Sequence, residues 1–111
     1  SRDVSIEGNQ IISTSGKAKS IRCISVVNAS NKQSDGVWGD TGTSILRFSY
    51  GNNLFTSASG IVRVADNIND RTTAVVQEVN NNNFVINWSK AGNGGTGTVQ
   101  MIFLVQYHGE G

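Results

Sequence analysis

The chain contains no proline, one cysteine and one histidine among its 111 residues. A single cysteine excludes an intrachain disulfide, and so few cysteine and histidine side chains argue against a tetrahedral zinc site. We therefore expect neither a metal nor another cofactor. Cys23 lies inside the apolar run SIRCISVV. This position predicts a small, buried hydrophobic side chain and not a reactive thiol.

Charged side chains are also scarce. They make up 15% of the chain, against roughly 25% in ordinary soluble domains, and the net charge is +1. This balance argues against electrostatic capture of nucleic acid or of an anionic membrane surface. No apolar run reaches about 18 residues, so we expect no membrane insertion. Glycine, asparagine, serine and threonine replace the charges, which favours surfaces that pack against copies of themselves.

The apolar segments are short, rich in Val, Ile, Phe and Tyr, and bounded by turn-forming residues. This pattern is typical of strands, and no segment shows the period of an amphipathic helix. A chain of this length supports one core, so residues 1–111 are predicted to form a single domain. We expect an all-β, antiparallel β-sandwich of about six to eight short strands, with little or no helix. The predicted strands lie near 4–7, 10–14, 19–28, 43–50, 60–65, 72–79, 83–90 and 97–107.

Alternation along the last two strands predicts their faces. Phe84, Ile86 and Trp88 share one face of NFVINWSK and are predicted to enter the core. In the final strand, both sets of alternating residues are partly apolar: Val99, Met101, Phe103, Val105 and Tyr107 on one face, and Gln100, Ile102, Leu104, Gln106 and His108 on the other. The final strand is therefore either central or covered on one face by another subunit. Without proline, charge, bulges or a partner chain must protect the sheet edges.

Residues 92–99, GNGGTGTV, match the phosphate-binding pattern G-x-G-x-x-G-x-V. The dinucleotide version requires a helix after the loop, whereas the strand-like sequence TVQMIFLVQY follows here. The kinase version requires lysine and aspartate residues downstream, but none occurs in the 12 residues after Val99. We predict that the loop is the bend of a β-hairpin, where glycine supplies positive φ angles.

No other motif indicates catalysis, and we expect that the chain is not an enzyme. His108 is the sole histidine, and no G-x-S-x-G elbow presents a nucleophile to it. The groups Asp66, Asn69 and Asp70, or Asp35 and Asp40, supply oxygen atoms for calcium, but neither follows the twelve-residue calcium loop. Our interpretation is that these residues form turns.

Three aromatic residues are candidate interface or ligand contacts: Trp38, Tyr50 and Tyr107. Trp38 lies in SDGVWGDTG, within a predicted polar loop over 28–42. There it plugs the end of the sandwich, contacts a neighbouring subunit or stacks on a sugar. Tyr50 and Tyr107 lie near predicted strand ends. Arg47 and Arg63 interrupt apolar strands, so we expect them on outer faces or in pairs across an interface.

From Gly16 to His108 the order of elements resembles a small all-β module of tailed-bacteriophage structural proteins. In that module F-x-I-x-W-x-K-x-G leads through a Gly/Thr turn into an apolar last strand, as FVINWSKAGNGGTGTVQMIFLVQ does here. The order of elements is also similar to H-type lectin domains, which are six-stranded sandwiches that form oligomers and bind sugars.

The resemblance implies a non-enzymatic protein of the virion, either decorating the capsid or forming part of a tail fibre or tip. Such a protein acts by self-assembly, with a homotrimer expected, and by contact with other virion proteins. The alternative is a lectin-like carbohydrate-binding module that recognises a glycan on the host surface.

Overall fold

The computed structural model describes residues 2–3, 6–27, 32–50, 53–57 and 59–108. These residues form ten strands and no helix, so the predicted all-β class is confirmed. The strands are β1 (Arg2–Asp3), β2 (Gly8–Ser13), β3 (Ala18–Val27), β4 (Gln33–Gly39), β5 (Ser44–Tyr50), β6 (Asn53–Ser57), β7 (Val62–Ala65), β8 (Arg71–Val79), β9 (Asn83–Ala91) and β10 (Thr98–Tyr107).

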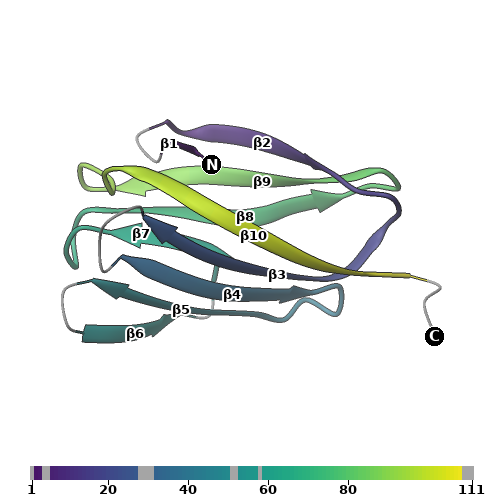
Figure 1. Ribbon diagram of the computed structural model, residues 1–111, viewed down its shortest axis with the longest axis horizontal. Coiled ribbons are helices and arrows are strands. Elements are labelled where there is room, and N and C mark those ends of the chain that lie inside the picture. The colour runs from purple at the N-terminus through teal and green to yellow at the C-terminus, as the bar shows by residue number, and fades with distance from the viewer. Residues whose placement is uncertain (1, 4–5, 28–31, 51–52, 58, 109–111) are drawn as a thin grey trace.

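The strands form two antiparallel sheets, consistent with the predicted β-sandwich. One sheet has six strands in the order β1-β10-β3-β4-β5-β6, and the other has four in the order β2-β9-β8-β7. In Figure 1 the six-stranded sheet lies in front, and β10 crosses over β8 and β9. None of the described residues belongs to a helix that could span a membrane.

The core lies between the sheets and is built from their inward-facing residues. Phe84, Ile86 and Trp88 of β9 are almost completely buried, as their alternation predicted. Ile21 and Cys23 of β3 enter the same cluster from the other sheet. Each large apolar side chain buried in this way contributes about 1.5–3 kcal/mol, so this layer is the main source of stability.

The two sheets approach each other closely at Gly36 of β4, which lies against Ile61, the residue before β7. A Cβ atom added to Gly36 would overlap the backbone of Ile61, including its carbonyl oxygen. Two residues further along each segment, the backbone N–H of Arg63 donates to the Ser34 hydroxyl at 3.2 Å. Glycine at position 36 therefore permits a backbone approach that any side chain would prevent.

Six predicted strands match β3, β5, β7, β8, β9 and β10, and the segment 10–14 corresponds to β2. The strand expected at 4–7 is not observed: Ile6 and Glu7 are not in a strand, and residues 4–5 lie outside the described residues. The loop expected over 28–42 is also wrong, because 33–39 form β4, while 28–31 are outside the described residues. β4 lacked the apolar alternation because Gly36 faces the core in place of a large side chain.

The predicted hairpin around 92–97 is wrong as well. β9 pairs with β2 and β8, whereas β10 pairs with β1 and β3, so the two strands belong to different sheets. The glycine loop carries the chain from one sheet to the other. Glycine-rich turns serve both connections, so composition alone did not separate them.

Candidate functional site

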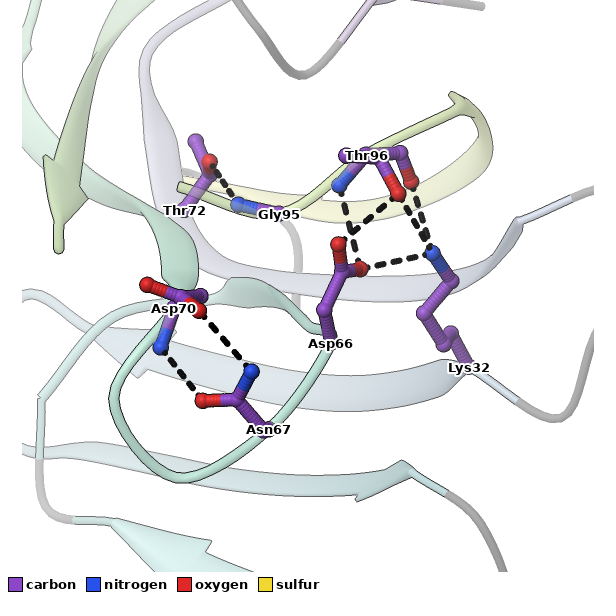
Figure 2. Close-up of polar contacts among 7 residues, drawn as sticks. All are labelled: Lys32, Asp66, Asn67, Asp70, Thr72, Gly95 and Thr96. Carbon is purple, nitrogen blue, oxygen red and sulfur yellow. Dashed lines mark hydrogen bonds and ion pairs between the residues drawn. The ribbon is translucent and has the colours of Figure 1, made fainter. Parts of the chain in front are cut away.

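The backbone amides of the glycine loop are bound by side chains of this chain. Asn93 donates its N–H to Asp70 Oδ1 at 2.9 Å, and Thr96 donates to Asp66 Oδ1 at 3.1 Å. Between them, the N–H of Gly95 donates to the buried Thr72 hydroxyl at 2.9 Å. Figure 2 shows Thr72 and Asp66 reaching this loop. Three of the loop amides are therefore already bonded to side chains of the same chain, which is unfavourable for phosphate binding at this loop.

Asp66 is the centre of the polar network at this loop. Its Oδ1 lies 2.8 Å from Lys32 Nζ, which also donates to the carbonyl oxygen of Thr96 at 2.8 Å (Figure 2). Burial alone would raise the pKa of Asp66, but the hydrogen bonds from Lys32 and Thr96 outweigh it and lower the pKa. The backbone N–H of Asn93 lowers the pKa of Asp70 in the same way. Both carboxylates are stabilised in the charged form.

The loop geometry requires its glycines. Gly92, Gly94 and Gly97 have φ angles of 62°, 78° and 105°. A Cβ on Gly95 would overlap the carbonyl oxygen of Val64. The prediction that glycine supplies positive φ here is confirmed, although the connection is a crossing between sheets.

Of the aspartates considered as calcium ligands, Asp66 and Asp70 lie in the turn between β7 and β8, and Asp40 lies in the turn after β4. Asp35 lies within β4, so its interpretation as a turn residue is wrong. The Asn67 Oδ1 atom accepts the backbone N–H groups of Asn69 and Asp70 at 2.8 and 3.0 Å, which is an Asx turn between β7 and β8 (Figure 2 draws the Asp70 bond). Over the described part of the chain, no three His, Cys, Asp or Glu residues gather closely enough to hold a metal ion.

The outer face of the six-stranded sheet gathers many of the exposed apolar side chains of the described structure. It carries seven of the eleven exposed large hydrophobic side chains found among the described residues, each between 38% and 64% exposed. They are Ile24 and Val26 on β3, Val37 on β4, Ile45 on β5, Leu54 on β6, and Ile102 and Leu104 on β10. We call these seven residues and their neighbours the apolar sheet face.

The strand register brings apolar side chains of neighbouring strands together at two places on the apolar sheet face. Ile102 lies directly opposite Ile24, and Val37 lies directly opposite Ile45. Such cross-strand neighbours have Cβ atoms roughly 5 Å apart, so their side chains touch. Two hollows with volumes of about 240 and 390 Å³ lie side by side on this face and share Ile24 and Gln33 in their walls.

A charged group lies at the centre of the apolar sheet face. Arg22 forms two hydrogen bonds with the Asp35 carboxylate, at 3.0 and 2.7 Å. The Arg22 guanidinium lowers the pKa of Asp35, and Arg47, across from Asp35 on β5, adds to this effect. The expectation that Arg47 lies on an outer face is confirmed. The three groups leave one net positive charge on the face.

The three aromatic candidates point to the inner side of the sandwich. Trp38 lies in strand β4, not in a loop, and packs against the core while remaining partly exposed. Tyr50 stacks on Phe55 with ring centroids 4.7 Å apart. Tyr107 lies over Gly16 and accepts the Ser15 N–H at 3.5 Å. The structure therefore does not bring these three residues together into one site.

Two further polar residues lie apart from the apolar sheet face. Arg63 is partly exposed, with its guanidinium carbon 4.9 Å from the centre of the Phe48 ring and its Nε donating to Thr73. His108 is exposed, and its Nε2 lies 2.7 Å from Asp40 Oδ2. This pair could not be predicted from the sequence, because the two residues are far apart in the chain.

Cys23 is fully buried, which confirms its predicted role as a small hydrophobic residue. Burial, with a smaller contribution from Asp35, raises the pKa of its thiol to about 12.

Comparison with known proteins finds no matching family model, no matching curated protein and no matching solved structure.

Proposed function

We propose that this domain is a non-enzymatic structural module that associates with copies of itself through the apolar sheet face. The observation that carries the proposal is the concentration of seven exposed aliphatic side chains on one sheet surface. Patches of this kind on soluble domains mark interaction sites, because their exposure to water is unfavourable.

The size of the apolar sheet face suits a weak or moderate contact between copies. Five strands about 4.8 Å apart, each of roughly seven residues with a rise of about 3.3 Å, cover on the order of 500 Å². Two such faces together bury roughly 1,000 Å², at the lower end of specific protein interfaces. A second copy of the same sheet presents a face of the same size.

The charges on the face oppose close contact, so the aliphatic side chains must provide the attraction. Arg22 and Asp35 neutralise each other through two hydrogen bonds, which lowers the cost of burying either charge alone. Arg47 leaves one net positive charge per copy, so two copies bring two like charges to the contact.

The apolar sheet face fits another protein copy better than a sugar. All eight aromatic side chains lie on strands at positions whose side chains face inward, so none stacks outward from the middle of either sheet. Sugar-binding faces commonly present aromatic rings, whereas this one presents Ile, Val and Leu. The lectin-like alternative therefore serves as an outcome of the test.

The proposed setting is the virion of a tailed bacteriophage, as a capsid decoration or a tail fibre or tip module. This setting rests on the sequence resemblance alone, as does the expected trimer. Repeated assemblies of this kind use small non-enzymatic domains with closed symmetry, and other virion proteins are the proposed further partners.

Paired substitutions test the proposal. Ile24→Lys and Ile45→Lys place charge in the middle of the apolar sheet face, and both side chains are exposed, so the fold should survive. Ile11→Lys is the matched control, because Ile11 is 66% exposed on the outer face of the other sheet. Sedimentation at tens of micromolar should show a lower mass for the first two variants and an unchanged mass for the control.

Two results would count against self-association through this face: equal masses for all variants, or a monomeric wild type. A wild type that is monomeric and binds a defined glycan on an array would favour the lectin-like alternative.

A further inference from the structure

Among the described residues, one edge of the six-stranded sheet is covered at one end only. β10 is ten residues long and pairs with β3 from Val99 to Tyr107. On its other side, the described part of the chain supplies only β1, which pairs with Val99 and Thr98. Residues 100–107 of β10 therefore present an unpaired edge among the described residues.

The hydrogen-bond pattern shows which β10 groups face this open edge. Val27 donates its N–H to Lys32, on the β4 side of β3, so alternation directs Ser25 and Cys23 towards β4 as well. The residues between them, Val26, Ile24 and Arg22, then bond to β10. Their partners are Gln100, Ile102 and Leu104. The N–H and C=O groups of Met101, Phe103 and Val105 point away from β3, towards the open edge.

The open edge carries none of the usual protection against strand addition. TVQMIFLVQY contains no charge and no proline, and no bulge interrupts residues 100–106. Ile102 and Leu104 are 64% and 52% exposed on the apolar sheet face. On the inner face, Met101, Phe103 and Val105 are only partly buried, so the core itself is open along this side.

The sequence of this edge is self-complementary about Phe103. Reading outward from Phe103 gives Ile102 and Leu104, then Met101 and Val105, then Gln100 and Gln106. Antiparallel pairing with an identical strand places apolar residues against apolar residues and amide against amide. The central pair, Phe103 with Phe103, and the pair of Met101 with Val105 use the groups that face the open edge.

We propose that β10 pairs edge to edge with β10 of a second copy, antiparallel and centred on Phe103, about a two-fold axis perpendicular to the sheet. The partner is a second copy because antiparallel pairing of β10 with an identical strand places apolar side chains opposite apolar side chains. In the same register, the N–H and C=O groups that face the open edge lie opposite each other. This inference rests on the proposed self-association and specifies a second interface for it. Two six-stranded sheets then join into one sheet of twelve strands.

Edge pairing also enlarges the apolar sheet face. A two-fold axis perpendicular to the sheet keeps both apolar faces on the same side, and Ile102 of one copy lies beside Leu104 of the other. The joined face then covers about 1,000 Å² per pair of copies, double that of one copy. Two such pairs stacked face to face make a tetramer with three perpendicular two-fold axes, whereas edge pairing alone gives a dimer.

Register-specific cross-linking tests the edge pairing. Ile102→Cys and Leu104→Cys are made in separate chains carrying different mass tags, both with Ile45→Lys to remove the face contact. In the proposed register, position 102 lies opposite position 104 of the second copy, about 5 Å away, whereas 102 and 102 are diagonal at roughly 7–8 Å. A disulfide requires Cα atoms closer than about 7 Å. Oxidation of an equal mixture should therefore yield heterodisulfide well above its statistical share of about one half.

A backbone variant provides the second readout. Val105→Pro removes an N–H that faces the open edge but leaves pairing with β3 intact, and proline is tolerated on such an edge. Val105→Ala is the matched control, because it shortens the same side chain and keeps the N–H. These two variants are made without Ile45→Lys. Val105→Pro should then lower the mass in solution, and Val105→Ala should leave it unchanged.

The outcomes separate this inference from the proposed function. Heterodisulfide at or below the statistical share, with Val105→Pro equal in mass to Val105→Ala, overturns edge pairing even if Ile24→Lys still dissociates the protein. A high heterodisulfide share together with an unchanged mass for Ile24→Lys supports edge pairing and contradicts the face contact.

Discussion

The hydroxyl of Thr72 accepts the backbone N–H of Gly95 at 2.9 Å, and both residues are buried. This bond joins β8 to the glycine loop at the point where the chain passes from one sheet to the other. Asp66 and Asp70 hold the same loop on either side. The segment that matches a phosphate-binding motif is thus a connection between the two sheets, held in place by side chains of the same chain.

Removal of the Thr72 hydroxyl should lower the free energy of unfolding, although the substitution changes only one small group. Thr72→Val keeps the shape but leaves the Gly95 N–H buried without an acceptor, which costs about 1–3 kcal/mol. Thr56→Val, at an exposed threonine of β6, should change stability by less than about 0.5 kcal/mol. Urea unfolding of the wild type and the two variants checks this prediction. Equal unfolding midpoints would contradict a stabilising role for the bond between Thr72 and Gly95.

Stability should fall in acid because three carboxylates have lowered pKa values when folded: Asp35, Asp66 and Asp70. A carboxyl group with a lowered folded pKa stabilises the fold above its unfolded pKa, about 3.9, and this contribution is lost as the pH falls through the folded pKa. Urea midpoints should therefore be constant above about pH 5 and decrease below about pH 4. Asp66→Asn should be less stable at pH 7 and show a shallower acid slope; a midpoint rising in acid would contradict this account.

Gly36→Ala should be among the most damaging single substitutions. The new methyl group overlaps the backbone of Ile61, so β4 and β7 must separate, and overpacking of this kind costs about 1–3 kcal/mol or more. Gly39→Ala lies three residues along the same chain segment, where the nearest atom is 3.8 Å from the added Cβ. Thermal melts should show a large decrease for the first variant and little change for the second. Equal melting temperatures would mean that the sheets are not in close contact at Gly36.

The Cys23 thiol should be unreactive in the folded protein. Its side chain is fully buried and its pKa is raised to about 12, so almost no thiolate exists at pH 8. A maleimide or disulfide reagent should label the chain slowly in buffer and rapidly in denaturant. Rapid labelling in buffer would show that the β3 layer of the core opens readily.

The fold class was predictable because most strands have regular alternation between turn-forming residues. β9 shows this best, since its inner residues are all apolar and buried. β4 was missed because glycine takes an inner position and Asp35, an outer one, is matched by Arg22 on the next strand. These are properties of neighbouring strands, not of the segment itself.

The interaction surface was only partly predictable. Alternation in β10 indicated that Ile102 and Leu104 share a face, and that the strand is either central or covered on one face by another subunit. The neighbouring positions on β3, β4 and β5 could be assigned to that face only through the strand register. Trp38 was singled out because it appeared isolated in a loop, and the structure places it against the core.

The solution mass of the wild-type chain tests the central claim most directly. Sedimentation equilibrium over a wide range of concentration, extending to tens of micromolar, should show species at integer multiples of the 11.8 kDa chain, with Ile45→Lys shifted towards smaller species and Ile11→Lys unchanged. A wild type that sediments as an 11.8 kDa monomer over the whole range would contradict self-association through the apolar sheet face.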